Sequence, residues 1–221
     1  PDQLERARQL AHLAHQGQKR KYTEEDYIIH PSQIVDNLQK YTSCQETLAA
    51  AWLHDVVEDT FVNLDDIKLL FNENISNYVF YLTEPLKVGQ GNRKFRKEAY
   101  IKQLSLAPSP VKLIKLLDID NNIHSIFEHD KKYAPIYLKE KIDFLNVLTE
   151  ADQSAFTLVE NNLRKLLFKL SQDHQEKEKN KIYLIFFIFI FSSFKLSSIS
   201  KLNFFSCSVI SFHHLRGLPH T

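Results

Sequence analysis

Glycine is scarce in this sequence, with 4 residues in a chain of 221. Walker-type phosphate loops and dinucleotide-binding fingerprints both need closely spaced glycines, and neither pattern occurs. Cysteine is also rare: Cys44 and Cys207 lie far apart, which excludes a disulfide framework and zinc-finger spacing. With so few thiols and no secretory signal at the start, we expect a protein of the reducing cytoplasm.

Methionine is absent, and because the chain opens on Pro1 we expect residues to precede it in the native protein. An excess of one charge is absent as well, since the formal net charge is +1. A dedicated nucleic-acid binder would be clearly basic, so we expect no nucleic-acid partner. Hydrophobic residues make up 43% and charged residues 25%, which is typical of a globular domain.

Apolar residues recur at helical spacing along most of the chain, with no alternating strand pattern and no internal repeat. We therefore predict an all-α fold, a compact multi-helix bundle formed by residues 1–168. Pro31 favours a helix start at that point, and Asn63 is a typical helix cap. Residues 75–83 fit either a helix or a strand. The other predicted helices cover residues 2–16, 31–41, 45–59, 63–71, 92–105, 110–127, 135–149 and 151–168.

The composition changes after residue 168. Residues 169–181 form a charge run that we interpret as a solvated linker. Residues 182–221 form an apolar tail rich in Phe, Ile and Ser, whose uninterrupted core is 10 residues long, half of the roughly 20 that a membrane span needs. A longer segment would take in Lys195 and Lys201. The tail is therefore either a weak membrane anchor or, as we favour, poorly structured or non-native sequence such as translated non-coding DNA.

Residues 50–60, AAWLHDVVEDT, place a histidine and three carboxylates in a predicted helix. At about 100° per residue, His54, Asp55, Glu58 and Asp59 share one arc opposite an apolar face. Carboxylates at this spacing repel one another unless a cation lies among them. Imidazole and carboxylate groups together suit a divalent metal. The alternative is a solvated acidic face with a histidine bonded inside its own helix.

Two further residues are candidate metal ligands. Asp118 lies among apolar residues in the predicted helix 110–127, where an aspartate is rare unless it is paired or metal-bound. His30 directly precedes Pro31. Taken alone, Asp118 could pair with a lysine such as Lys115 or be exposed, and His30 could be a turn or cap residue. Taken with His54 and Asp55, they form a set of two histidines and two aspartates that matches a divalent-metal site.

Three stretches in this order, AHQGQKRK…YIIHP, AAWLHDVVEDT and KLIKLLDIDNN, resemble the hydrolase domain of the RelA/SpoT alarmone enzymes and their small stand-alone relatives. That domain belongs to the HD metal-dependent phosphohydrolase superfamily. The resemblance implies an HD-domain bundle that holds one divalent ion, typically manganese (Mn²⁺). The implied metal ligands are His30, His54, Asp55 and Asp118, and the implied catalytic pair, which positions or deprotonates the attacking water, is Glu58 and Asp59.

Basic side chains precede His30 and recur in the predicted helix 92–105. The resemblance assigns two of the first group to the nucleotide and an asparagine after Asp118 to the ribose. Helical spacing puts three cations of the second group on one side, where they form either a clamp for a second phosphate or a solvated basic face. The candidate substrate-binding residues are Arg20, Lys21 and Asn122 for the nucleotide, and Arg93, Arg96 and Lys97 for the phosphate.

The sequence departs from the family's pattern around Asp118. Leu117 stands where a small alanine is usual, and Ile119 and His124 stand where basic residues are usual. We expect a hydrolase that removes the 3′-diphosphate of guanosine tetra- or pentaphosphate. Because of these departures, another phosphorylated nucleotide such as NADPH is a second candidate substrate. A non-catalytic helical regulatory module and a membrane-tethered sensor are the remaining alternatives, and the oligomeric state stays unassigned.

Overall fold

The computed structural model describes residues 2–175, which form helices joined by loops. Within this range there is no strand, only isolated bridges such as the one between Lys19 and Asp26. The all-α prediction is therefore confirmed for the described part of the chain. The helices are α1 (Gln3–Ala14), α2 (Ile29–Leu38), α3 (Gln45–Leu53), α4 (Val56–Asp59), α5 (Leu64–Leu70), α6 (Glu73–Leu82), α7 (Arg93–Ser105), α8 (Ser109–His129), α9 (Ala134–Leu145) and α10 (Gln153–Gln175).

Asparagine side chains set several helix starts. Asn63 caps α5 as predicted: its side chain accepts hydrogen bonds from backbone N–H groups of the first turn, and Asp66 bonds back to the Asn63 N–H in a capping box. Asn72 and Asn92 cap α6 and α7 in a similar way. The ambiguous residues 75–82 belong to α6 and Thr83 is its C-cap; the Asn72 cap and a buried apolar face both favour the helix.

The single helix predicted over residues 45–59 is wrong, because the chain breaks it at His54 and Asp55. In a continuous helix the Ala51 carbonyl would accept from the Asp55 N–H. Here Nδ1 of His54 lies 2.8 Å from that carbonyl oxygen and competes for it. The chain turns, and α4 begins at Val56. His54 and Asp55 therefore lie in a turn between two helices, and Nε2 of His54 is 3.0 Å from Oδ2 of Asp55.

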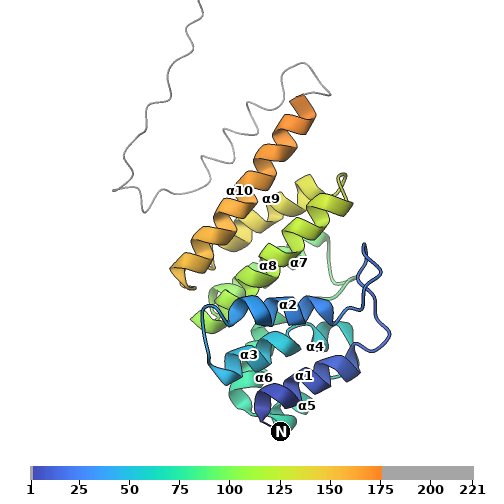
Figure 1. Ribbon diagram of the computed structural model, residues 1–221, viewed down its shortest axis with the longest axis vertical. Helices are drawn as coiled ribbons and strands as arrows, with labels where there is room; N and C mark the ends of the chain where they lie inside the picture. Colours follow the sequence, from blue (N-terminus) through green and yellow to red (C-terminus); the bar gives the residue numbers. More distant parts are fainter. Residues whose placement is uncertain (1, 176–221) are drawn as a thin grey trace, which may run out of the picture. The chain divides into compact units, whose positions relative to one another are not determined.

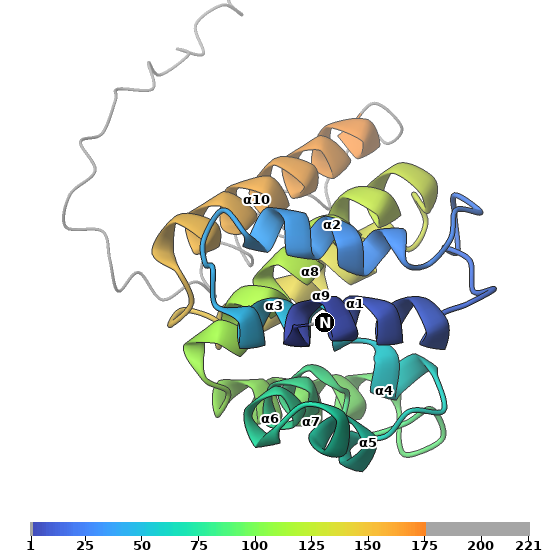
Figure 2. The same cartoon turned by 60° about the horizontal axis from the view of Figure 1, so that its bottom comes forward.

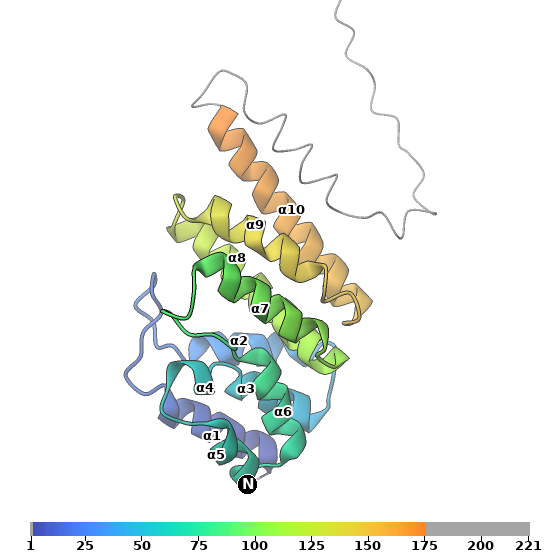
Figure 3. The same ribbon diagram turned by 180° about the vertical axis from the view of Figure 1, so that it is seen from behind.

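Helix α8 is the centre of the bundle and packs against α2, α3, α6, α9 and α10 (Figures 1 and 2). Helix α3 is also enclosed, and every residue from Thr47 to Leu53 is buried. The chain leaving α3 consequently carries His54 into the interior, with 1% of its surface exposed. Seen from behind, α7 lies in front of α8 (Figure 3). The Tyr100 ring of α7 contacts Phe144 of α9, with 5.6 Å between the ring centroids.

Helix α10 runs to Gln175, so the helix continues past residue 168, where we expected a linker to begin. The rest of that linker, and the tail at 182–221 with its suggested anchor, lie outside the described residues. None of the described helices has the length and apolar character to span a bilayer.

Candidate metal centre

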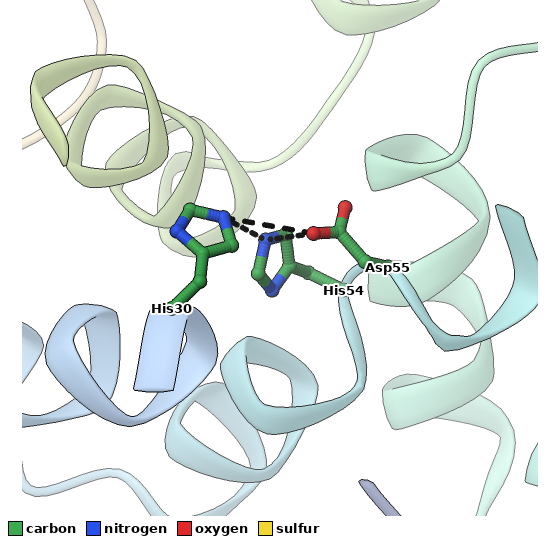
Figure 4. A group of neighbouring side chains, drawn as sticks. All are labelled: His30, His54 and Asp55. Carbon is green, nitrogen blue, oxygen red and sulfur yellow. Dashed lines mark hydrogen bonds and ion pairs between the residues drawn. The ribbon is translucent and has the colours of Figure 1, made fainter. Parts of the chain in front are cut away.

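The four predicted metal ligands come together from separate elements. His30 lies in the first turn of α2, His54 and Asp55 lie in the turn between α3 and α4, and Asp118 lies in the middle of α8. Figure 4 shows His30, His54 and Asp55 pointing at one another. One ligand atom from each of these three lies within 4.8 Å of the others, which is a spacing that could hold a metal ion.

Several distances between the candidate ligand atoms are close to 3 Å. Nε2 of His54 lies 3.0 Å from Oδ2 of Asp55 and 3.3 Å from Nε2 of His30. Nε2 of His30 lies 3.6 Å from the same Asp55 oxygen and 3.2 Å from Oδ1 of Asp118. Ligands about 2.1 Å from a shared ion and at right angles to one another are about 3 Å apart. His30, His54 and Asp55 therefore have the spacing of a coordination shell, and Asp118 lies beside them, with its Oδ1 3.9 Å from Nε2 of His54.

Asp118 divides its carboxylate between two partners. Its Oδ1 faces the histidines and accepts a hydrogen bond from Nδ2 of Asn122 at 2.6 Å. Its Oδ2 forms an ion pair with Nζ of Lys115 at 2.7 Å, which confirms the lysine pairing considered from the sequence. Burial acts to raise the pKa of Asp118, but Lys115 and the two imidazoles hold it well below its usual value. The aspartate is thus kept ionised in the interior.

Both imidazoles are oriented through Nδ1. That atom of His54 bonds to the Ala51 carbonyl, which can only accept, so Nδ1 carries the proton. Nδ1 of His30 lies 2.8 Å from Oδ1 of Asn121, whose amide nitrogen donates to Gln33. This oxygen also accepts, so His30 has the same tautomer. In its neutral form, each ring would therefore present the lone pair of Nε2 to the centre, as a metal ligand must.

The centre has a strong preference for positive charge. Burial acts to lower the pKa of His54, but Asp55 and then Asp118 raise it to about 9. A proton on Nε2 of His54 thus balances the two aspartates. A divalent ion bound among the same atoms would supply more positive charge and leave both imidazoles neutral.

The predicted catalytic pair lies on α4, beside Asp55. Glu58 is exposed over much of its surface, yet its carboxylate end lies close enough to Asp55 that desolvation and then this negative charge raise its pKa to about 7. Oε2 of Glu58 accepts a hydrogen bond from the Glu84 N–H at 3.2 Å. Burial and Asp55 also raise the pKa of Asp59, whereas the Tyr27 hydroxyl acts in the opposite direction.

The predicted nucleotide-binding residues differ in where they lie. Arg20 reaches the centre indirectly, since its Nη2 donates to Asn121 Oδ1 at 3.3 Å. Asn122 bonds directly to Asp118. Lys21 instead places its ammonium over the Tyr22 ring, 4.9 Å from the ring centroid. The structure thus brings two of these three residues to the metal ligands.

The predicted phosphate clamp on α7 is engaged within the fold. Arg93 forms a two-pronged ion pair with Glu140, with both distances 2.7 Å. Arg96 donates to the Gly91 carbonyl oxygen at 2.8 Å. Lys97 pairs with Glu84. An incoming phosphate would have to compete with these acceptors for the three cations.

Sequence reasoning missed several residues that contact the centre. Asn121 was not singled out, although it is three residues after Asp118 and so shares the inner side of α8. Tyr27 carries no signal of a site role in the sequence, yet its hydroxyl donates to Oδ2 of Asp55 at 2.5 Å. Glu84 joins Glu58 to Lys97, and no local pattern signals this link because the three residues come from separate segments.

Comparison with known proteins gives a consistent picture. The family model described as "HD domain" matches residues 7–134. The guanosine-3′,5′-bis(diphosphate) 3′-pyrophosphohydrolase of Aquifex aeolicus is 31% identical over 183 residues, covering 81% of this chain and 25% of that protein. The enzyme of the same name from Vibrio cholerae is 30% identical over 201 residues, covering 83% of this chain and 28% of that protein. The chain thus spans about a quarter of the length of these relatives.

A solved structure has the same fold. It is described as a metazoan ortholog of SpoT that hydrolyzes ppGpp, and it superimposes with a TM-score of 0.68. The match covers 75% of this chain and 96% of that one at 23% sequence identity. This likeness supports the helical architecture in which the four candidate ligands are placed.

Proposed function

Because this chain belongs to the HD-domain family, we propose that it is a metal-dependent phosphohydrolase that removes the 3′-diphosphate of guanosine tetra- and pentaphosphate. The observation that carries the proposal is the convergence of His30, His54, Asp55 and Asp118 with both Nε2 lone pairs facing inward. We infer the identity of the substrate from the relatives, which are named as 3′-pyrophosphohydrolases. We propose Mn²⁺ as the ion.

The donor set fits one divalent ion. Two imidazole nitrogens and two carboxylate oxygens are a borderline-to-hard set, suited to manganese and to similar ions. Such an ion, when bound, polarises a phosphoryl oxygen and makes water easier to deprotonate. Asp118 is held ionised by Lys115, and each histidine is held in the correct tautomer by a partner outside the set. The protein thus orients the ligands for a metal ion, and His54 would give up its Nε2 proton when the ion binds.

We assign the two carboxylates of α4, Glu58 and Asp59, to orienting and deprotonating the attacking water. A base works best when its pKa lies near the working pH, and that of Glu58 is raised to about 7. The Glu84 N–H holds one Glu58 oxygen and leaves the other free to orient a water molecule. Asp59, one residue further along α4, shares this task. The reaction is then an in-line attack of water on the phosphorus bonded to the 3′ oxygen. The bond between this phosphorus and the 3′ oxygen breaks, the 3′ oxygen takes up a proton and becomes the 3′-hydroxyl of GDP or GTP, and the water oxygen remains on the released pyrophosphate.

Basic residues around the centre are assigned to the nucleotide. Asn122 contacts the metal ligand Asp118, and Arg20 contacts Asn121, the partner of His30, so both lie where the 3′ end of the substrate has to approach. Lys21 follows Arg20 in the same loop. The second diphosphate is assigned to the three cations of α7, which are Arg93, Arg96 and Lys97. They exchange their present acceptors for its oxygens, and this exchange favours a substrate with several negative charges.

The test is a product analysis with two substrates. The purified chain is incubated with Mn²⁺ and either guanosine tetraphosphate or NADPH, and the products are separated by ion-exchange chromatography. We expect GDP and pyrophosphate from the first substrate, and loss of both products with EDTA or in Asp55→Asn. Phosphate and NADH from NADPH alone would replace the proposed substrate by the alternative. No product from either would favour a non-catalytic module.

A further inference from the structure

Three of the four proposed metal ligands have a hydrogen-bond or ion-pair partner that orients the side chain; Asp55 is the exception. The backbone carbonyl of Ala51 orients His54, Asn121 orients His30, and Lys115 with Asn122 orients Asp118. Asp55 lies in the turn that begins α4, and its side chain makes no capping bond to that helix. Its carboxylate would be free to rotate unless another residue held it.

The hydroxyl of Tyr27 provides that contact. It donates to Oδ2 of Asp55 at 2.5 Å, which is the short distance of a hydrogen bond to a charged acceptor. The same oxygen lies 3.0 Å from Nε2 of His54 and 3.6 Å from Nε2 of His30. Tyr27 thus bonds to the Asp55 oxygen that faces the centre.

Tyr27 itself is held from three sides. Its backbone N–H donates to the Gln18 carbonyl at 3.0 Å, and its carbonyl accepts from the His30 N–H at 2.9 Å. Its ring packs on the buried His15 ring, with 4.7 Å between centroids, and meets His30 nearly edge-on at 5.8 Å. The hydroxyl is therefore a fixed donor, placed by residues outside the metal set as well as by the turn that carries His30.

The need for this donor increases when the centre is loaded. Oδ2 of Asp55 also lies near the Nε2 atoms of His30 and His54, and both of these nitrogens must turn lone pairs toward a bound ion. They then have no proton to donate to Asp55. Tyr27 has no such conflict, because its proton is not displaced by the ion.

We propose that Tyr27 is a positioning residue, whose hydroxyl fixes the Asp55 carboxylate in the orientation that binds the divalent ion. The inference rests on the proposed function, in which Asp55 is a metal ligand. Removing an outer partner of a metal ligand typically weakens metal affinity or activity by about 10- to 100-fold. The same loss is expected when the Tyr27 hydroxyl is removed.

The experiment compares two Tyr→Phe variants of the full chain. Tyr27→Phe removes the hydroxyl and keeps the ring that packs on His15. Tyr22→Phe is the matched control, since the Tyr22 hydroxyl lies in the same loop and donates to an aspartate, Asp130, at 3.0 Å, away from the metal ligands. Binding of Mn²⁺ alone is titrated by the loss of the free-ion electron paramagnetic resonance signal, at a temperature where thermal unfolding shows all metal-free proteins to be folded.

We expect Tyr27→Phe to bind Mn²⁺ about 10- to 100-fold more weakly than the parent and Tyr22→Phe to bind it equally well. With guanosine tetraphosphate, the activity lost by Tyr27→Phe at limiting manganese should return in excess manganese, with KM for the nucleotide unchanged. Equal Mn²⁺ affinity of Tyr27→Phe and the parent would overturn the positioning role while leaving the proposed function intact. A parent chain that binds no Mn²⁺ would instead overturn the proposed function itself.

Discussion

Replacing Asp118 by Asn tests the electrostatics of the centre without a metal. The substitution keeps the size of the side chain and removes its charge. In the folded chain Asp118 pairs with Lys115 at 2.7 Å, and the two side chains are 8% and 12% exposed. The variant leaves the Lys115 ammonium in a low-dielectric interior without its counter-ion.

The expected loss follows from that burial. Removing one partner of a buried ion pair typically costs about 3–5 kcal/mol, because the remaining charge is uncompensated. Asparagine can still accept the hydrogen bond from Asn122, so we expect the lower end, about 3 kcal/mol. The matched control is Asp26→Asn. Asp26 pairs with Lys19 at 2.6 Å, but the two side chains are 66% and 52% exposed, and such pairs contribute less than about 1 kcal/mol.

The pH dependence has a definite sign. The pKa of Asp118 is lowered well below its usual value in the folded chain. Its ionised form therefore stabilises the fold fully above the pKa of the unfolded chain, about 3.9, and this contribution is lost as the pH falls through the folded-state value. The difference between the parent and Asp118→Asn should be full near neutral pH and shrink below about pH 4.

Urea unfolding in EDTA, followed by circular dichroism, measures these free energies. The account predicts a large loss for Asp118→Asn and a small one for Asp26→Asn. Equal losses for the two variants would refute the reasoning, since distance alone would then decide the strength of the pair. A loss for Asp118→Asn that is independent of pH would also contradict it.

Three further changes have definite expected results. Glu58→Gln should keep Mn²⁺ affinity and lower kcat on guanosine tetraphosphate by about 100-fold or more, and near-normal turnover would remove Glu58 from the mechanism. Burial and two neighbouring lysines lower the pKa of Lys141 to about 7 in the folded chain. Above this pH the Lys141 amine is protonated in the unfolded chain but not in the folded chain. Lys141→Met should therefore raise the free energy of unfolding at neutral pH by about 1–3 kcal/mol, and urea titrations should show this gain shrinking toward pH 10. Gly91 has φ +98°, and a Cβ there would lie 2.6 Å from the Phe95 ring, whereas Gly89 has φ +99° and open space around it. Gly91→Ala should therefore lower the melting temperature more than Gly89→Ala. Equal shifts in melting temperature would show that the clash with Phe95 is relieved.

The fold was largely predictable because its determinants are local. Caps such as Asn63 and the helical spacing of apolar residues gave the order of the helices. The break at His54 was not predictable from periodicity, since it depends on a side chain taking the Ala51 carbonyl from the backbone. Two of the candidate metal ligands, His54 and Asp55, lie in that break, so part of the centre lies where the predicted helix was wrong.

The candidate ligands could be named from residue type and from the family resemblance, but not the groups that orient them. Lys115 was a visible candidate for Asp118 because the two are three residues apart on one helix. Asn121 and His30 are 91 residues apart, and Glu84 and Glu58 are 26 apart. Such pairs depend on how α2, α4 and α8 pack, which a single sequence does not state. The catalytic and substrate-binding roles stay predictions.

The most direct test of the central claim is the manganese content of the chain after equilibrium dialysis. If His30, His54, Asp55 and Asp118 form one metal centre, the parent should retain a single Mn²⁺ per chain, and His54→Ala and Asp55→Asn should each retain almost none. Unchanged manganese content in Asp55→Asn, or none in the parent, would contradict the account.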